Sequence, residues 1–346
     1  MASEKENLIE VKNLKKYYYP KSGFGKKMKV VKAVDGVSFQ IQSGETFGIV
    51  GESGCGKTTL GRTVIDMIRA TEGEIWFEGE NILLQKKADL KETHQKMQII
   101  YQDPYSSLDP TMTVFQLISE PLQVSGSYTK EEKYEKVKAL LEQVGLSEND
   151  LQKNAYEFSG GQRQRIGIAR ALANNPTFIM CDEPISALDV SIQAQIINLL
   201  ADCQEEMGLT YLFIAHDISI VHRFCDRIAV MYLGKIVEMG TSDEIYYSPK
   251  HPYTQALLSA IPIADPEKAK TRTRIILEGD PPSPMNIPAG CRFHTRCPQA
   301  MEICKTVSPE ETHLSLDHQV FCHLYKEGAL PVEEEKSAQL ESTENP

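Results

Sequence analysis

The feature that most constrains this chain is a glycine-rich loop between an apolar segment and a helix-forming one. Residues 46–50 form a short apolar run, residues 59–69 have the composition of a helix, and residues 51–58 between them match G-x-x-x-x-G-K-[ST]. In such a loop, backbone N–H groups wrap phosphate oxygens and the lysine reaches the β/γ oxygens. A turn that binds nothing is the alternative, but the strand before the loop and the helix after it favour phosphate binding. The predicted site comprises Gly51, Glu52, Ser53, Gly54, Cys55, Gly56, Lys57, Thr58 and Thr59.

An acidic pair further along the chain supplies the second part of phosphate chemistry. Asp182 and Glu183 directly follow the apolar run 178–181. We expect Asp182 to hold Mg²⁺ together with the Thr58 hydroxyl, and Glu183 to orient and polarise the attacking water as a general base. Such a pair alone is common at turns, and the upstream loop is what favours catalysis.

The rest of the chain alternates strand-like and helix-like segments, which predicts a mostly parallel sheet covered by helices, an α/β fold. The glycine- and lysine-rich segment 21–29 is expected to be a surface loop. Strands are predicted at 9–11, 37–41, 74–77, 98–101, 178–181, 211–215, 227–231 and 235–239, and helices around 130–144, 162–173 and 191–206.

Residues 158–165, Phe-Ser-Gly-Gly-Gln-Arg-Gln-Arg, resemble the signature sequence of ATP-binding-cassette (ABC) ATPases. The order of motifs also matches that family over roughly residues 9–239, with Phe158 where leucine is more usual. The resemblance implies an ABC-type P-loop NTPase fold, with a mixed core sheet, an antiparallel β subdomain and a helical subdomain. It also implies ATP and Mg²⁺ as ligands and a hydrolysing subunit.

The resemblance assigns further site residues. It makes Gln102 the Q-loop glutamine near Mg²⁺, residues 186–189 the D-loop ending in Asp189, and His216 the switch histidine near the γ-phosphate. Tyr18 fits the position that stacks on adenine, with Tyr17 and Tyr19 as competitors.

The signature opens a predicted helix, where Ser159 can cap and exposed N–H groups suit a phosphate. One chain does not need two phosphate sites, and the resemblance explains the second one. In ABC ATPases two subunits meet head to tail, and the signature of each completes the site of the other. The signature residues are Ser159, Gly160, Gly161 and Gln162.

Three further segments, 102–110, 251–258 and 290–298, resemble the oligopeptide and dipeptide permease ATPases of the OppF/DppF type. That resemblance implies peptide import with a binding protein, two membrane permease subunits and a second ATPase subunit, for which a heterodimer with an OppD/DppD-type partner is expected. Nickel importers share much of this sequence, and a soluble regulatory ABC ATPase is the alternative of a different class.

Cysteines 291, 297, 304 and 322 cluster near the C-terminus with the spacing C-x5-C-x6-C-x17-C. Thiolates select soft or borderline metals, so zinc and iron–sulfur clusters are the candidates, and unpaired reduced thiols are the alternative. The peptide-permease resemblance implies a [4Fe–4S] cluster on Cys291, Cys297, Cys304 and Cys322. Alternative ligands nearby are His294, His313, His318 and His323.

We predict an ATPase domain at 1–260 with a helical subdomain inserted at 103–156, then a small Cys-rich C-terminal module, the peptide-permease-type extension at 261–328 with the four-Cys cluster, and a disordered acidic tail at 329–346. The net charge of −11 argues against nucleic acid as a partner. No apolar run approaches the roughly 20 residues of a membrane span, and the N-terminus lacks the apolar core of a signal peptide. These features predict a cytoplasmic chain, and the transporter resemblance implies a peripheral subunit at the cytoplasmic face of the membrane.

Overall fold

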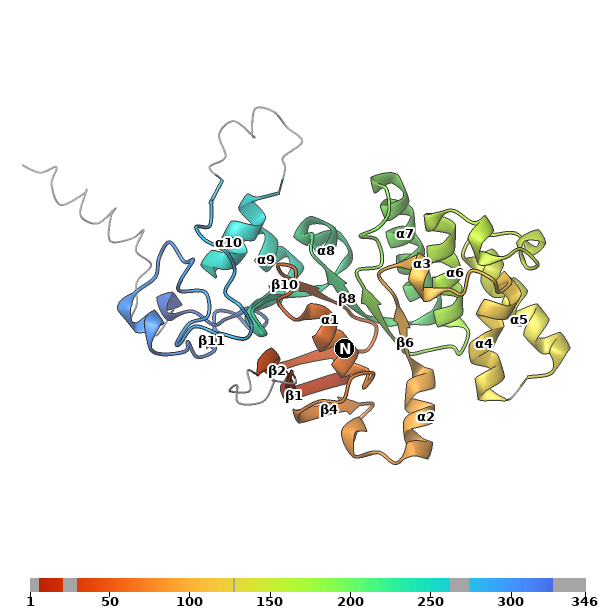
Figure 1. The fold of residues 1–346 in the computed structure, drawn as a ribbon, viewed down its shortest axis with the longest axis horizontal. Helices are drawn as coiled ribbons and strands as arrows, with labels where there is room; N and C mark the ends of the chain where they lie inside the picture. The colour runs from red at the N-terminus through yellow and green to blue at the C-terminus, as the bar shows by residue number, and fades with distance from the viewer. Residues whose placement is uncertain (1–5, 21–29, 127, 262–273, 326–346) are drawn as a thin grey trace, which may run out of the picture.

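In a computed structural model, which describes residues 6–20, 30–126, 128–261 and 274–325, the central element is an eight-stranded mixed sheet in the order β11-β12-β10-β9-β3-β8-β7-β6 (Figure 1). Five adjacent strands run parallel, with β3 between β8 and β9, whereas β10, β12 and β11 join antiparallel. The predicted mixed core sheet is confirmed. The strands are β3 (Thr46–Val50), β6 (Met97–Ile100), β7 (Phe178–Asp182), β8 (Thr210–Ala215), β9 (Arg227–Tyr232), β10 (Lys235–Thr241), β11 (Thr312–His313) and β12 (Gln319–Val320).

A second, antiparallel sheet of four strands covers one side of helix α1 (Lys57–Val64). Its long strands alternate buried and exposed residues, as expected for a sheet with one face in the core. Phe39 of β2 stacks on Phe47 of β3 with ring centroids 5.1 Å apart, so the two sheets share a core. The strands, in the order β2-β1-β4-β5, are β1 (Asn7–Tyr18), β2 (Val31–Gln42), β4 (Glu72–Phe77) and β5 (Glu80–Asn81).

Helices dominate the segment expected to be a helical insertion, and Figure 1 shows them at one end of the molecule. Capping boxes fix two helix starts, at Thr113 for α4 and at Thr129 for α5. Helices α3, α4 and α5 all pack on α6, which carries the signature. The bounds are α2 (Lys87–Lys96), α3 (Pro104–Ser107), α4 (Val114–Ser125), α5 (Lys130–Gln143), α6 (Gly160–Leu172) and α7 (Val190–Met207).

The C-terminal segment returns to the main sheet. After α8 (Ile218–Phe224), α9 (Ser242–Tyr247) and α10 (Pro252–Ser259), the short strand β12 pairs with β10 at Glu238↔Val320 and Met239↔Gln319. Phe293 from the same segment is buried in the larger core cluster. The predicted surface loop 21–29 and the predicted acidic tail lie outside the described residues. Within the described part of the chain, no helix is long and apolar enough to cross a membrane.

Candidate nucleotide site

The glycine-rich loop lies at the carboxyl end of β3, which is buried along its whole length between two parallel neighbours. At Gly56 the backbone φ is 111°, and a Cβ there would lie 2.1 Å from the Ala33 carbonyl oxygen, so only glycine fits. Lys57 begins α1 and is 4% exposed. Its Nζ donates to the carbonyl oxygens of Gly51, at 2.8 Å, and Glu52, at 3.2 Å, which holds the amine inside the loop.

Asp182 ends β7 and is fully buried. One carboxylate oxygen accepts from the Thr58 hydroxyl at 2.8 Å, and the other accepts from Arg62 of α1 at 3.1 Å. The pair predicted to hold Mg²⁺ is therefore brought together. A hydroxyl beside a buried carboxylate is the hard oxygen donor set that Mg²⁺ takes in proteins, so these residues fit the ion. Arg62 was not identified from the sequence.

Glu183 is where the other predicted catalytic residues converge. Its backbone has a φ of 47°, an uncommon left-handed conformation for a residue other than glycine, and its N–H donates to the Ile214 carbonyl at 3.0 Å. Its carboxylate accepts from Gln102 Nε2 at 3.0 Å and lies 3.5 Å from His216 Nδ1 and 3.8 Å from Lys57 Nζ. The structure thus gathers residues that follow β3, β6, β7 and β8.

A cleft of about 260 Å³ opens over this cluster. Most of its lining comes from the glycine-rich loop, with Gln102 and Glu183 opposite, and Pro284 of the proline-rich segment also contributes. Sequence reasoning placed Pro284 in an extended linker and gave it no role. The lining residues are Val31, Ala33, Ser53, Gly54, Gly56, Lys57, Thr58, Thr59, Gln102, Glu183 and Pro284.

The signature residues do not line this cleft. Ser159 caps α6 by accepting from the Gln162 N–H at 3.4 Å, while the Gln162 side chain accepts from the Ser159 N–H at 3.0 Å. A Cβ on Gly161 would lie 2.7 Å from Ile192, which explains the small residue. Asp189 occupies the N-cap position of α7 without a side-chain cap bond.

The three candidate adenine contacts differ in their surroundings. Tyr17 donates its hydroxyl to Asp35, and both burial and this carboxylate raise the tyrosine pKa. Tyr18 is 38% exposed with Lys16 over its ring, and Tyr19 is 53% exposed. Tyr17 is therefore the least exposed of the three and carries Lys32 over its ring, while Tyr18 and Tyr19 reach further into solvent.

The prediction of a C-terminal [4Fe–4S] cluster, or of zinc, is wrong. In the described part of the chain, no three His, Cys, Asp or Glu side chains form a group that could hold a metal ion. Cys291 and Cys304 are buried in the main core, Cys297 packs against it, and Cys322 packs with Val320 and Leu324.

These thiols behave as small apolar side chains. Burial raises the pKa of Cys297 to about 11 and of Cys322 to about 12, with smaller contributions from neighbouring cysteines. The alternative histidine ligands have other partners. His294 contacts the Cys291 carbonyl, His313 lies beside Glu311, His318 beside Glu238, and His323 contacts the Val307 carbonyl.

Comparison with known families agrees with this geometry. Residues 34–186 match the family described as ABC transporter, and residues 237–304 match the oligopeptide/dipeptide transporter C-terminal region. Among solved structures, the ATP-binding cassette MJ0796, in a dimeric post-hydrolysis state bound to ADP and Pi, is similar with a TM-score of 0.60 and 30% identity, covering 68% of this chain and 98% of that one.

Curated relatives match over most of their length. The oligopeptide transport ATP-binding protein AppF of Bacillus subtilis is 52% identical, covering 94% of this chain and 99% of that protein. The oligopeptide transport ATP-binding protein OppF of Escherichia coli is 48% identical, covering 91% and 95%. The chain therefore belongs to the ABC transporter ATPases, in the group that contains AppF and OppF, as its motifs predicted.

Proposed function

We propose that this chain is the ATP-hydrolysing subunit that powers import of oligopeptides or dipeptides by a binding-protein-dependent ABC transporter. The observation that carries the proposal is the convergence on Glu183 of Gln102, His216 and Lys57 beside the phosphate loop. The match of residues 237–304 to the peptide-transporter C-terminal region, and the names of AppF and OppF, support peptides as the cargo.

In the proposed mechanism, the loop N–H groups of residues 51–59 wrap the ATP phosphates, and Lys57 turns from the Gly51 and Glu52 carbonyls toward the β/γ oxygens. Thr58, Asp182 and Gln102 would hold Mg²⁺, which would supply positive charge to neutralise the phosphate oxygens. Tyr18 stacks on the adenine. Glu183 accepts the proton of the attacking water, and His216 contacts the γ-phosphate.

The signature of this chain acts in a second site. Ser159, Gly160, Gly161 and Gln162 present the start of α6 to the ATP of another subunit, and Asp189 lies at the same contact. We assign that partner as a different ATPase of the OppD/DppD type. This arrangement accounts for a signature that does not line its own cleft.

The remaining assignments follow from the transporter. We propose an ATPase domain at 1–260, with the helical insertion 103–156 docking two membrane permease subunits, and a C-terminal extension at 261–328. An extracellular binding protein delivers the peptide. The chain thus acts at the cytoplasmic face of the membrane as a peripheral subunit.

The test is Glu183→Gln in the assembled transporter. We expect ATP turnover to fall at least about 10²-fold, because the general base is lost, with ATP binding retained. Glu45→Gln is the matched control, since Glu45 is buried and paired with Arg227 at the opposite end of β3. Turnover that survives Glu183→Gln contradicts the assignment.

Uptake into proteoliposomes then identifies the cargo. Labelled oligopeptide should accumulate with ATP, whereas nickel uptake without peptide uptake indicates the related nickel importer. Failure of the chain to co-purify with two polytopic membrane proteins indicates the soluble regulatory ATPase.

A further inference from the structure

The second residue of the phosphate loop is held by an arginine 244 positions away. The Arg296 guanidinium contacts both Glu52 carboxylate oxygens, NH1 to Oε2 at 2.9 Å and NH2 to Oε1 at 3.2 Å. The Arg296 side chain is only 8% exposed. A bidentate, charge-assisted pair in a mostly dry setting fixes geometry as well as adding energy.

A second contact holds the backbone of the same residue. The Glu52 N–H donates to the Tyr253 hydroxyl at 2.8 Å, and Tyr253, from α10, is fully buried. The Glu52 carbonyl accepts from Lys57 Nζ at 3.2 Å. All three polar groups of Glu52 are therefore engaged, and a shift of Glu52 would move the backbone of the loop that also carries Lys57.

The residues that contact Glu52 are held in place by packing and hydrogen bonds. Tyr232, Tyr253 and Phe293 form an aromatic cluster with ring centroids 4.7 to 5.4 Å apart, joining β9, α10 and the C-terminal segment. Arg296 follows Phe293 by one turn, its N–H donating to the Phe293 carbonyl at 2.9 Å.

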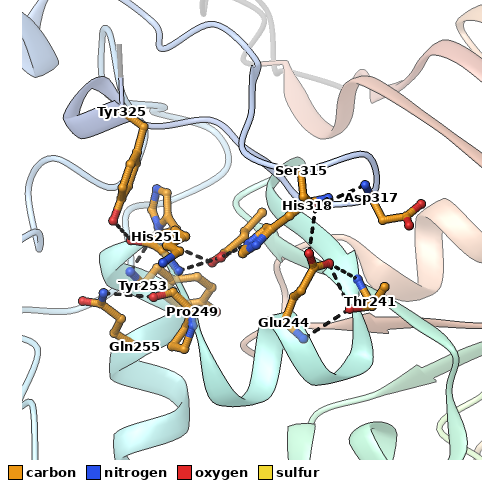
Figure 2. Close-up of polar contacts among 12 residues, drawn as sticks. Thr241, Glu244, Pro249, His251, Tyr253, Gln255, Ser315, Asp317, His318 and Tyr325 are labelled. Atoms are coloured by element: carbon orange, nitrogen blue, oxygen red, sulfur yellow. Dashed lines mark hydrogen bonds and ion pairs between the residues drawn. The ribbon is translucent and has the colours of Figure 1, made fainter. Parts of the chain in front are cut away.

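Figure 2 shows what anchors α10. The His251 Nδ1 accepts from the Tyr253 N–H at 3.1 Å, and Glu238 accepts from the backbone N–H groups of Lys250 and His251. His318, from the C-terminal segment, contacts the same Glu238 carboxylate at 2.8 Å. The support of Tyr253 thus extends to residues next to β12.

We propose that Arg296 and Tyr253 are positioning residues of the nucleotide site, which keep the phosphate loop in its ATP-binding conformation and balance the charge of Glu52, the neighbour of the cleft-lining Ser53. The C-terminal segment thereby becomes part of the nucleotide site. This inference rests on the proposed ATPase function and assigns to that site residues outside its motifs.

The test measures KM and kcat for ATP in the assembled transporter, with nucleotide affinity of the full-length chain alongside. For Arg296→Gln we expect KM to rise about tenfold with kcat within about twofold, because a misplaced loop weakens binding before chemistry. For Tyr253→Phe, which removes a single hydroxyl, we expect KM to rise about threefold.

The matched control is Arg227→Gln. It breaks a comparable arginine–carboxylate pair, Arg227 with Glu45 at 3.2 Å, at the opposite end of β3. It should lower the melting temperature but leave KM for ATP within about twofold. The variant Glu52→Gln/Arg296→Gln should recover part of the affinity lost in Arg296→Gln, because the unpaired carboxylate beside the phosphates is gone.

A wild-type transporter that hydrolyses ATP, combined with an Arg296→Gln KM no higher than that of Arg227→Gln, overturns this inference alone. A double variant whose KM for ATP is no lower than that of Arg296→Gln also overturns it. A wild-type transporter without ATPase activity overturns the proposed function and this inference together. Should Arg296→Gln fail to fold, Tyr253→Phe with an unchanged KM carries the same refutation.

Discussion

The contact between Asp182 and Arg62 makes a quantitative prediction. Asp182 is fully buried, and Arg62, whose side chain is 37% exposed, donates to it at 3.1 Å. In Asp182→Asn the amide oxygen accepts from Arg62 and the N–H₂ donates to the Thr58 hydroxyl, so both contacts persist, but the guanidinium loses its buried charged partner. We expect unfolding free energy to fall by about 2–3 kcal/mol, below the usual cost of breaking a fully buried pair because Arg62 reaches water.

The companion variant is Arg62→Met, which keeps the apolar stem and leaves the buried carboxylate with Thr58 alone. Urea unfolding of both single variants and the double variant gives the coupling energy, expected at about 1.5–3 kcal/mol. The effect of Mg²⁺ with ATP on the melting temperature then distinguishes the role of Asp182 from that of Arg62. Mg²⁺ with ATP should raise the melting temperature of Arg62→Met as in the wild type, whereas Asp182→Asn should lose the Mg²⁺-dependent part.

Two outcomes would refute this reasoning. A coupling energy near zero would mean that the ion pair adds nothing to the fold. A full Mg²⁺-dependent rise in Asp182→Asn would remove this carboxylate from the proposed magnesium site.

Burial lowers the pKa of His251 to about 4. Between about pH 4 and 6.5, this histidine is therefore neutral in the folded chain but protonated in the unfolded chain. The free energy of unfolding should therefore fall by about 1.4 kcal/mol per pH unit as pH drops from about 6.5 towards 4. Urea unfolding midpoints measured against pH should fall less steeply for His251→Asn than for the wild type, and equal slopes contradict the prediction. A Cβ on Gly48 would lie 2.4 Å from Val221 Cγ1, so Gly48→Ala should cost about 1–3 kcal/mol. The control Gly167→Ala, in open space on α6, should instead stabilise by up to about 1 kcal/mol, and a Gly48→Ala melting temperature at or above the wild-type value would disprove the clash.

The sequence predicts the structure well where one short segment contains both the hydrophobic pattern and the residues whose position depends on it. The run 178–181 predicted a buried strand, and the acidic pair after it lies as expected because a parallel strand delivers its last residues to one edge. Strand β12 has only two residues and pairs with β10 some 80 positions earlier. It is too short to show the alternation of apolar and polar residues that predicts a strand. The ion pair between Arg296 and Glu52 likewise joins two distant segments. In the sequence, Glu52 is simply a member of the phosphate loop and Arg296 a member of the cysteine-rich segment, so neither residue predicts the pair.

The cysteine spacing failed for a different reason. Four thiols in a stretch too small for its own core predicted a metal staple. Phe293 and Cys291 from that stretch instead share the core of the ATPase domain, with Tyr232 and Tyr253, so it needs no separate staple. Spacing alone does not distinguish a metal-binding cysteine from a cysteine that packs as a small apolar side chain in the core of the adjacent domain.

The topology of the sheet explains why only one of the two phosphate-type motifs lines the cleft over Glu183. The loop, Gln102, Glu183 and His216 each follow the carboxyl end of a parallel strand, and such ends meet at one edge of the sheet. The signature follows no strand, because it opens α6 after the helical insertion. Its N–H groups therefore lie apart from this cleft. A helix start that is capped at Ser159 and lies outside this cleft supports the proposal that the signature serves another subunit's phosphate, so the proposed hydrolysis depends on the assembled pair.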